Sequence, residues 1–375
     1  MRFAAAVFLL LLAACSSDPV EPLVEPTIET STPTPTPTFI YPGKDWAKAA
    51  TIDANFEQLN TDLANARSTC FALIKDGELV YDAYWGGTSI RTTRPAYSIT
   101  KSVTAILVGI AADEGKLALD DNASKYIPEW RRTAARNVTI RDLLSNTSGR
   151  HWDYNTDYSQ MVRRAPDKTA FAIGLGQDAK PGTKWDYNNS AVQTLEAVLE
   201  KATGQDVAAY GKKRLLDPIG MRDTTWAHDA AGNTTTYSGI DSSCRDLARV
   251  GYLMMRSGAW KGKQLVSDSF VAEATNESSS QLNAAYGLLW WVNKPGRIVT
   301  IDRAAGFPND KPPYRGQLAP KAPEDTFWAL GYGSEYVMVI PSEGLVAVRM
   351  GSRPNTPEQL SYASFTEGVL KALHR

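Results

Sequence analysis

The sequence predicts an α+β protein in which helices flank an antiparallel sheet and an all-helical region is inserted into it. Strand-like runs occur toward both ends of the chain, helical patterns fill the middle from about residue 111 to 245, and short turns join neighbouring strands. Strands at both ends with helices between them indicate a sheet assembled from the two ends of the chain.

The elements follow in order along the chain. Residues 46–66 carry apolar residues at helical spacing, and 68–87 hold two strand-like runs around Asp76-Gly77, a strong hairpin signal. Further strands are predicted at 285–293, 297–302, 326–333 and 335–351, with a closing helix at 356–374. The proline-rich segment 304–325 is either a lid or binding loop, or a plain surface excursion.

Length and charge narrow the class of protein. The 375 residues suit one large domain or two interlocked ones, and a formal net charge of −1 gives no electrostatic reason to expect a nucleic-acid partner. We assign residues 45–375 to the folded domain. Its sheet is expected from about 45–110 and 246–375, with the helical insertion at about 111–245.

The first residues indicate export. Residues 1–14 combine a positive start with an apolar run too short to span a bilayer as a mature helix, which is typical of a cleaved signal peptide. Leu-Ala-Ala-Cys resembles the lipobox of bacterial lipoproteins, which implies cleavage before Cys15 and its lipidation. Ser16 after it implies outer-membrane sorting. The alternative is a plain secretory signal with a chance cysteine.

Residues 15–44 are rich in proline and threonine and have almost no apolar periodicity. Such a segment cannot bury enough surface to fold, so we expect a tether between membrane and domain. Cys70 and Cys244 remain after Cys15. In an exported protein they could form a disulfide, or both could be buried small hydrophobes.

Ser98 and Lys101 are the first candidate catalytic residues. An apolar helix is predicted to start near Ser98, and positions three apart lie on one side of a helix. A serine hydroxyl needs a nearby base, and a lysine can be that base if burial lowers its pKa. The alternative is a helix-capping serine beside a lysine whose stem covers apolar surface.

Tyr187 and Asn189 stand just before a second apolar helix. A phenol near a cationic lysine can lose its proton more easily, so we expect Tyr187 to shuttle protons between Ser98 and a leaving group. Asn189 could hydrogen-bond Lys101 or a substrate carbonyl. Alternatively, the pair is an aromatic turn residue and a helix cap.

With these motifs the chain resembles the penicillin-recognising serine hydrolases, the group of class C β-lactamases, D-Ala-D-Ala peptidases and esterases. Ser98-x-x-Lys101 and Tyr187-x-Asn189 match the first two motifs of that family. Longer phrases match as well, at 138–149, 181–191, 215–226, 242–267 and 336–351. The resemblance spans about 65–372 and implies a site between the sheet and the helical region.

The third family motif, often Lys-Thr-Gly or His-x-Gly, is altered here. The closest alignment places Ala329-Leu330-Gly331 there, so the resemblance implies that the N–H groups of Ser98 and Tyr332 form the oxyanion hole, beside Gly331 and Gly333. Another alignment shifts the role to Ser334 or Glu335. The missing cation argues against carboxylate-bearing substrates and favours the branch of 6-aminohexanoate-dimer hydrolases and related esterases.

The same branch places substrate-contacting residues after "NTSGRHW", where this chain has Asp153, Tyr154, Asp157 and Tyr158. A plain polar loop is the alternative. The histidines show no metal spacing and no cofactor motif is present, so we expect neither a metal nor a cofactor.

The sequence thus predicts an exported, lipid-anchored serine hydrolase that cleaves an ester or amide of a small molecule or peptide through a Ser98 acyl-enzyme. The alternatives are a β-lactamase or D-Ala-D-Ala peptidase, and a non-catalytic lipoprotein that binds cell-wall peptides.

Overall fold

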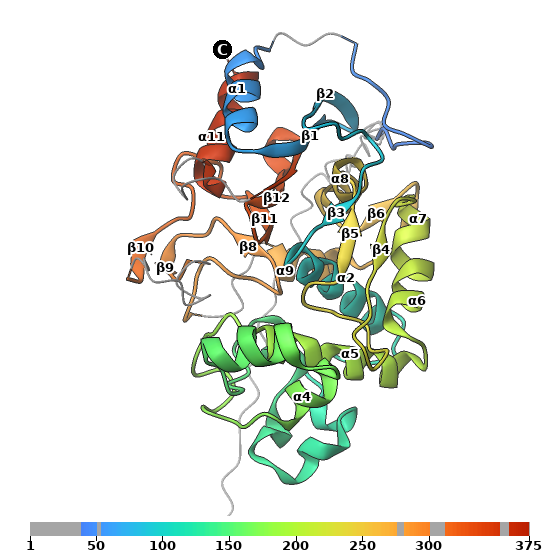
Figure 1. Ribbon diagram of the computed structural model, residues 1–375, viewed down its shortest axis with the longest axis vertical. Helices are drawn as coiled ribbons and strands as arrows, with labels where there is room; N and C mark the ends of the chain where they lie inside the picture. Colours follow the sequence, from blue (N-terminus) through green and yellow to red (C-terminus); the bar gives the residue numbers. More distant parts are fainter. Residues whose placement is uncertain (1–38, 51–53, 276–280, 301–311, 353–359, 375) are drawn as a thin grey trace, which may run out of the picture. The chain divides into compact units, whose positions relative to one another are not determined.

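The computed structural model describes residues 39–50, 54–275, 281–300, 312–352 and 360–374 (Figure 1). The predicted signal peptide, Cys15 and the tether up to residue 38 lie outside the described residues, as does 304–311 of the proline-rich segment. Among the described residues, no helix has the length and apolar character that crossing a membrane requires.

A six-stranded antiparallel sheet forms the core, and its strand order joins the two ends of the domain. The order is β2-β1-β13-β12-β11-β8, so β1 and β2, drawn blue in Figure 1, lie beside the strands drawn red. The predicted α+β class, with a sheet assembled from both ends, is confirmed. The strands are β1 (Ser68–Lys75), β2 (Glu78–Tyr84), β8 (Trp291–Val292), β11 (Phe327–Gly331), β12 (Glu335–Ile340) and β13 (Leu345–Gly351).

Helices cover both faces of this sheet, which is why β12 and β13 are apolar along nearly their whole length. On one face, Gly251 of α8 (Cys244–Met255) lies so close to Val346 that an added Cβ would be 2.6 Å from a Val346 methyl. On the other face, Phe365 of α11 (Tyr362–Leu373) packs edge-on against Phe71. The helix α1 (Glu57–Asn65) contacts both α11 and β1.

The helix α2 (Ile99–Asp113) runs through the interior and begins at Ser98, as its apolar pattern predicts. Every residue from 99 to 111 is buried. Its start is fixed by the N–H of Ala96, which donates to the carbonyl of Ile240. Because this hydrogen bond joins backbone groups, it helps to hold residue 98 in place independently of any side chain.

The region between α2 and α8 is mainly helical. Its helices are η1 (Ala123–Lys125), η2 (Pro128–Arg132), η3 (Ala134–Asn137), α3 (Ile140–Leu144), η4 (Asn155–Val162), α4 (Lys168–Gly174), α5 (Asn189–Thr203), α6 (Val207–Gly211), η5 (Lys212–Leu216) and α7 (Asp217–Ile219). The expectation of an all-helical region is wrong in one detail, because a small sheet joins it to the start of α2. Its strands are β3 (Arg94–Pro95), β5 (Ile240–Ser242) and β4 (Thr225–Trp226).

Three predicted elements differ from the structure. The helix expected at 46–66 is limited to α1, because the backbones of Ala47 and Ala49 pair with Leu79 at the sheet edge. The closing helix starts at Tyr362, where Ser361 forms a capping box. The strand expected at 297–302 lies outside the main sheet. It corresponds to β9 (Gly296–Ile298), which pairs with β10 (Tyr314–Gly316).

Smaller elements follow α8 in the chain. They are β6 (Ala259–Trp260), β7 (Lys263–Gln264) and α9 (Asp268–Thr275).

Of the two possibilities left open for Cys70 and Cys244, the structure has the disulfide. The bond joins β1 to the first residue of α8 and closes a loop with a sequence separation of 174 residues. It therefore links the two sequence-distant halves of the sheet layer.

Candidate active site

Ser98 lies at the first turn of α2, on a strained piece of backbone. The preceding residue, Tyr97, has φ of 47°, in the left-handed region that non-glycine residues rarely adopt. Such strain persists only where the surroundings impose it, and it is common at functional sites. Ser98 is half-buried, so its hydroxyl is held at the edge of the protein interior.

Lys101 lies one turn further along α2 and is only 1 % exposed. Its Nζ donates to Ser98 Oγ at 2.9 Å, to Asn189 Oδ1 at 2.6 Å and to the Tyr237 carbonyl oxygen at 3.0 Å. The three acceptors come from three separate segments and saturate the three hydrogens of the ammonium group. The arrangement places the amine nitrogen within proton-transfer distance of the serine hydroxyl.

Burial lowers the pKa of Lys101 to about 7, and the negative charge of Asp157 opposes this shift in part. In a large fraction of the protein molecules, Lys101 is therefore a neutral amine at neutral pH. Only the neutral amine can accept the proton of Ser98, so the burial of this lysine supplies what the chemistry of a base requires.

Tyr187 completes the group. Its phenol hydrogen-bonds the Ser98 side chain, and the Lys101 Nζ lies 4.8 Å from the centre of its ring. The expectation that the neighbouring lysine makes this phenol easier to deprotonate is wrong. Burial raises the pKa of Tyr187 far above its ordinary value, and the charges of Tyr158 and Asp157 add to the rise. The phenol therefore stays protonated and can act as a donor.

Asp157 lies beneath the site, contrary to its predicted role as a substrate contact. It is 1 % exposed, and its carboxylate accepts four hydrogen bonds from the first two residues of α5. The donors are the N–H groups of Asn189 and Ser190, the Asn189 side-chain amide and the Ser190 hydroxyl. A carboxylate with these four donors has no surface left for a substrate.

Asn189 is likewise buried, at 3 % exposed, and its amide is engaged on both sides. The oxygen accepts from Lys101 and the nitrogen donates to Asp157 at 2.7 Å. Of the two partners expected for Asn189, the structure provides the lysine.

Tyr154 and Tyr158 lie nearer the surface. Their rings stack with centroids 5.0 Å apart, and Tyr154 is 41 % exposed. Tyr158 lies in the π-helix η4, and Tyr154 is the residue directly before it. The hydroxyl and the N–H of Thr156 donate to Asp153 and, with His151, lower its pKa to about 2. Asp153 therefore anchors the start of this helix.

The other side of the site is made by the turn between β11 and β12. Gly331 at the end of β11 passes so close to Ala96 that an added Cβ would lie 2.6 Å from the Ala96 carbonyl oxygen. The ring of Tyr332, which follows, meets the ring of Tyr97 edge-on at 5.5 Å. The end of β11 and the residues before Ser98 are thus in direct contact.

Arg349 on β13 holds this turn from behind and was not found by sequence reasoning. Its buried guanidinium donates to the carbonyl oxygens of Gly333 at 2.7 Å and Ser334 at 2.9 Å. Both turn residues have positive φ, so the turn is tight. The detectable signal was a single arginine within the apolar run "LVAVRMG".

Glu335, one of the alternative oxyanion residues, has a buried side chain whose oxygens accept from the N–H of Gly351. Burial raises its pKa to about 8, against the charge of Arg349. Its carboxyl group therefore belongs to the support of the turn, behind the surface that Gly331 presents.

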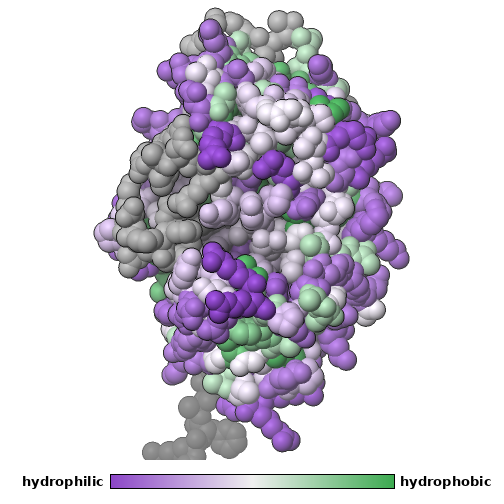
Figure 2. All heavy atoms as spheres, in the orientation of Figure 1, coloured by the Kyte–Doolittle hydropathy of each residue, from purple (hydrophilic) through white to green (hydrophobic). Residues whose placement is uncertain are grey.

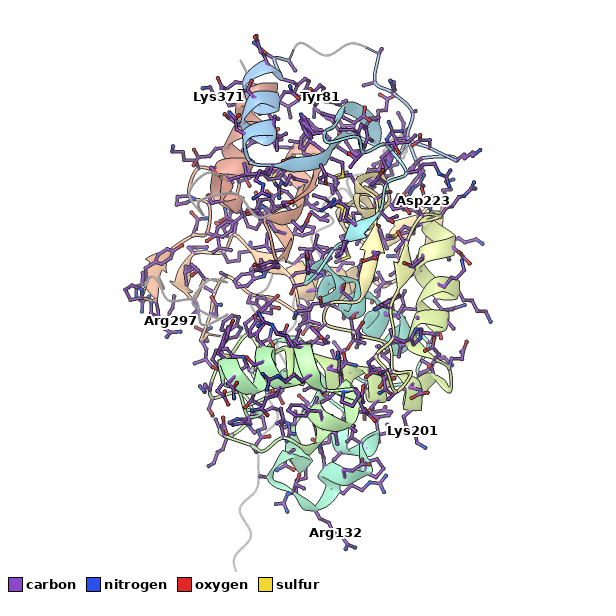
Figure 3. The ribbon with its side chains drawn as sticks, viewed as in Figure 1. Tyr81, Arg132, Lys201, Asp223, Arg297 and Lys371 are labelled. Carbon is purple, nitrogen blue, oxygen red and sulfur yellow. A yellow bond between two sulfur atoms is a disulfide. The ribbon has the colours of Figure 1, made fainter. Side chains whose placement is uncertain are left out.

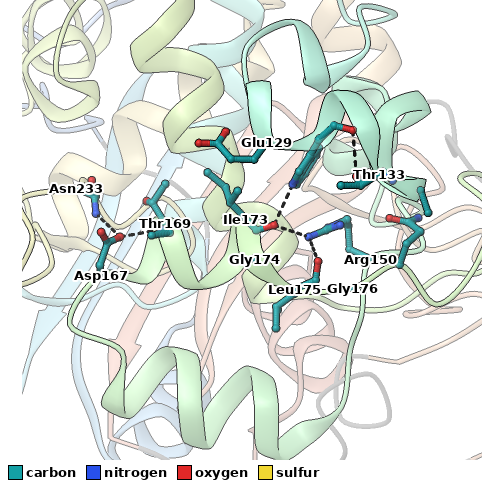
Figure 4. Close-up of a pocket in the computed structure, with 15 residues that line it drawn as sticks. Glu129, Thr133, Arg150, Asp167, Thr169, Ile173, Gly174, Leu175, Gly176 and Asn233 are labelled. Carbon is teal, nitrogen blue, oxygen red and sulfur yellow. Dashed lines mark hydrogen bonds between the residues drawn. The ribbon is translucent and has the colours of Figure 1, made fainter.

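A cavity of about 650 Å³ lies elsewhere, in the helical region (Figure 4). It is bounded by η2 and α4, and Arg150 beside it donates to the carbonyl oxygens of Ile173 and Leu175. None of the candidate catalytic residues lines it. Figure 2 shows hydrophobic surface over this lower, helical part of an otherwise mainly hydrophilic face. Among the described residues, no cluster of histidine, cysteine and carboxylate side chains could hold a metal ion.

Comparison with known proteins decides the family. The model of the beta-lactamase family matches residues 52–365. The chain belongs to the beta-lactamase family. This confirms the family predicted from the two motifs, and with it the class of enzyme, a serine hydrolase. Family membership also agrees with the contact between Ser98, Lys101 and Tyr187.

Several relatives share this family likeness over different lengths. An uncharacterized protein of Alkalihalophilus pseudofirmus, BpOF4_21049, is 24% identical over 334 residues, which are 80% of this chain and 89% of that protein. The esterase EstB of Burkholderia gladioli is 29% identical over 209 residues, 47% of this chain and 50% of that enzyme.

Solved structures share the fold of this beta-lactamase family chain. A Bacillus anthracis protein assigned as a 6-aminohexanoate-dimer hydrolase has a TM-score of 0.71 at 19% identity, covering 90% of this chain and 91% of that one. A family VIII carboxylesterase has a TM-score of 0.62 at 17% identity, covering 87% and 99%. At these identities the likeness is one of fold.

Proposed function

We propose that this protein is an exported serine hydrolase that cleaves a neutral ester or amide through an acyl-enzyme on Ser98. The observation that carries the proposal is the Lys101 amine, which lies 2.9 Å from Ser98 Oγ and is buried so that its pKa is about 7. A protein that only binds peptides gains nothing from a partly neutral lysine against a serine.

Acylation begins when neutral Lys101 takes the proton of the Ser98 hydroxyl while the oxygen attacks the carbonyl carbon of the substrate. Tyr187, which stays a phenol and hydrogen-bonds Ser98, donates its proton to the departing oxygen or nitrogen. The Lys101 ammonium then restores the phenol, so the tyrosine relays one proton without carrying a lasting charge.

The tetrahedral intermediate places a negative charge on the former carbonyl oxygen. The N–H groups of Ser98 and Tyr332 are the proposed donors to this oxyanion. We expect these two N–H groups to lie close together, because Gly331 closely approaches Ala96. The rings of Tyr97 and Tyr332 are also in contact. Water then attacks the acyl carbon while neutral Lys101 takes one of its protons. As the bond between the acyl carbon and Ser98 Oγ breaks, the Lys101 ammonium returns that proton to Ser98 Oγ, which restores the hydroxyl and the neutral amine and releases the acid.

The substrate class follows from the altered third motif. Strand β11 reads "FWALG" and carries no lysine or histidine that could meet a substrate carboxylate. This favours neutral esters or amides over penicillins and D-Ala-D-Ala peptides. The name of one relative, the esterase EstB, points the same way. We place the substrate beside the exposed Tyr154 and Tyr332.

Export and lipidation at Cys15 remain part of the proposal. The Cys70–Cys244 disulfide supports export, because such bonds persist in oxidising compartments. An acyl-modified Cys15 would hold the domain at a membrane surface, with the residues before Phe39 as its tether, because Tyr252 and Arg249 hold Ile40 and Gly43 against the domain.

The test is a substrate panel on the wild type and Ser98→Ala: p-nitrophenyl acetate, nitrocefin, a D-Ala-D-Ala peptide and the aminohexanoate dimer. We expect turnover of the ester, complete loss in Ser98→Ala, and labelling of Ser98 by a fluorophosphonate. Ester turnover that survives in Ser98→Ala would refute the nucleophile, and preferred turnover of nitrocefin would refute the substrate class.

A further inference from the structure

The carboxylate of Asp157 lies directly behind the amide that Lys101 contacts, and its hydrogen bonds go to Asn189 and Ser190. We propose that Asp157 is a positioning residue for Lys101: it fixes the orientation of the Asn189 amide and holds a negative charge behind the amine, so that it sets the pH range of activity. The proposal rests on the proposed function, in which Lys101 is the base.

The orientation of Asn189 follows from the partners on its two sides. A carboxylate only accepts hydrogen bonds, so the side of Asn189 that faces Asp157 must be the NH₂ group. The amide oxygen is then left to face Lys101, at 2.6 Å. With the amide flipped, its hydrogens would face those of the lysine and its oxygen would face the carboxylate. Asp157 excludes that arrangement.

Burial raises the pKa of Asp157 above its ordinary value, and its four hydrogen-bond donors, which favour the ionised form, oppose this shift. All four of its partners donate to it, and a proton on the carboxyl group would compete with one of them. Two of these donors are N–H groups in the first turn of α5, where a negative charge is also stabilised by the helix dipole.

Polar groups from every neighbouring segment face Lys101. Asn189 is on α5, Tyr187 precedes it, and Tyr237 lies before β5 with its ring centre 5.6 Å from Nζ. Tyr158 on η4 and Tyr286 lie beyond Tyr187 and Asn189, and burial raises the pKa of both phenols. These tyrosines are neutral near pH 7, so Asp157 supplies the charge to which the lysine responds.

The sign of the effect follows from this charge. Burial pushes Lys101 toward its neutral form, and the Asp157 carboxylate stabilises the ammonium form against that push. Activity requires the neutral amine, so kcat/KM should rise with pH through the pKa of Lys101, about 7. Without the carboxylate the amine would lose its proton more easily, and the rise would occur at lower pH.

The experiment compares Asp157→Asn with Ser190→Ala. Ser190→Ala removes one partner of Asp157 but keeps the charge, and Asp157→Asn removes the charge but keeps an acceptor oxygen for Asn189. Both proteins are assayed from pH 5 to 9 for kcat/KM on p-nitrophenyl acetate and for the rate of Ser98 labelling by a fluorophosphonate. Rates are divided by the fraction of protein that can be labelled, so that only folded molecules count.

In Asp157→Asn we expect kcat/KM to rise with pH about one pH unit lower than in the wild type, a typical effect of one nearby charge. This rising part of the pH profile is called the acid limb below. Its activity at pH 5.5, relative to its own plateau, should then rise about tenfold. The plateau should fall, because a less basic amine is a weaker base. Ser190→Ala should keep the acid limb of the wild type.

An acid limb that stays in place in an active Asp157→Asn would overturn the proposal, as would an equal shift in Ser190→Ala. If Asp157→Asn yields no protein that can be labelled, Asp157→Ser, which leaves room for water, is measured in the same way. Failure of both to give labelled protein would make Asp157 a folding residue and also overturn the proposal. Failure of the proposed function is distinct, because the wild type itself would then show no Ser98 label.

Discussion

The two sides of the candidate site are built from different chemical groups. On the base side the functional groups are buried side chains: the Lys101 amine donates to Asn189 and to Ser98, and the Tyr187 phenol interacts with Ser98. On the proposed oxyanion side, the groups expected to act are backbone N–H groups, those of Ser98 and of the turn after Gly331. The buried side chain of Arg349 holds this turn by its carbonyl oxygens.

This difference predicts which changes each side tolerates. Side-chain substitutions should damage the base side, where each polar atom has a specific partner. The oxyanion side should tolerate a change of side chain at Tyr332, which is 51 % exposed, but not the loss of a backbone N–H. Substitutions at Lys101 and Tyr332 change the two sides separately, and removal of the Cys70–Cys244 disulfide changes neither side.

The largest effect is expected for Lys101→Met, which keeps the length of the side chain and removes the base. We expect kcat/KM on p-nitrophenyl acetate to fall by roughly 10⁴, the upper end of what a positioned base contributes. The control is Lys201→Met, because Lys201 points outward from α5 (Figure 3). Retention of more than a tenth of the activity in Lys101→Met would remove the lysine from the mechanism.

On the oxyanion side, Tyr332→Pro should lower kcat by roughly 10²–10³, because proline has no N–H and loss of one oxyanion donor typically costs that much. Tyr332→Ala keeps the N–H and should stay within about threefold in kcat, although KM can rise with the loss of the ring. Similar losses in both variants would show that the ring matters, and would move the donor role to Ser334 or Glu335.

The smallest effect on activity is expected for removal of the disulfide, which belongs to neither side of the candidate site. Replacing both Cys70 and Cys244 by serine should leave kcat nearly unchanged at 25 °C. It should still lower the free energy of unfolding by about 5 kcal/mol, the chain-entropy value for a loop of this length. Urea unfolding with and without the bond measures this. A large fall in kcat with unchanged stability would contradict the independence of bond and site.

The part of the site that could be predicted from sequence is the part made of local motifs. Ser98 and Lys101 share one helix, and an apolar pattern predicted both that helix and its start. Tyr187 and Asn189 were singled out by their match to the second family motif, at the start of α5. In each case the residue type indicates the chemistry, and the spacing within one helix or turn indicates which side chains can meet.

The rest depends on contacts between segments that are far apart in the chain. Asp157 was taken for a substrate contact, because a polar loop residue gives no sign that it will be buried under α5. Arg349 supports a turn whose nearest residue is 15 positions earlier. The expected acidity of Tyr187 failed because burial, which no motif reports, outweighs the nearby lysine in setting the pKa of the phenol.

The pairing of β1 with β13 has a consequence for the order of folding. As the chain is made from its N-terminus, β1 and β2 emerge early, but the strand that pairs with the other edge of β1 ends only at Gly351. Until then the two strands form a lone hairpin, which is at best marginally stable in water. The protein must therefore remain without its central sheet during nearly all of its synthesis, and it commits to the native structure only when its last strand is available.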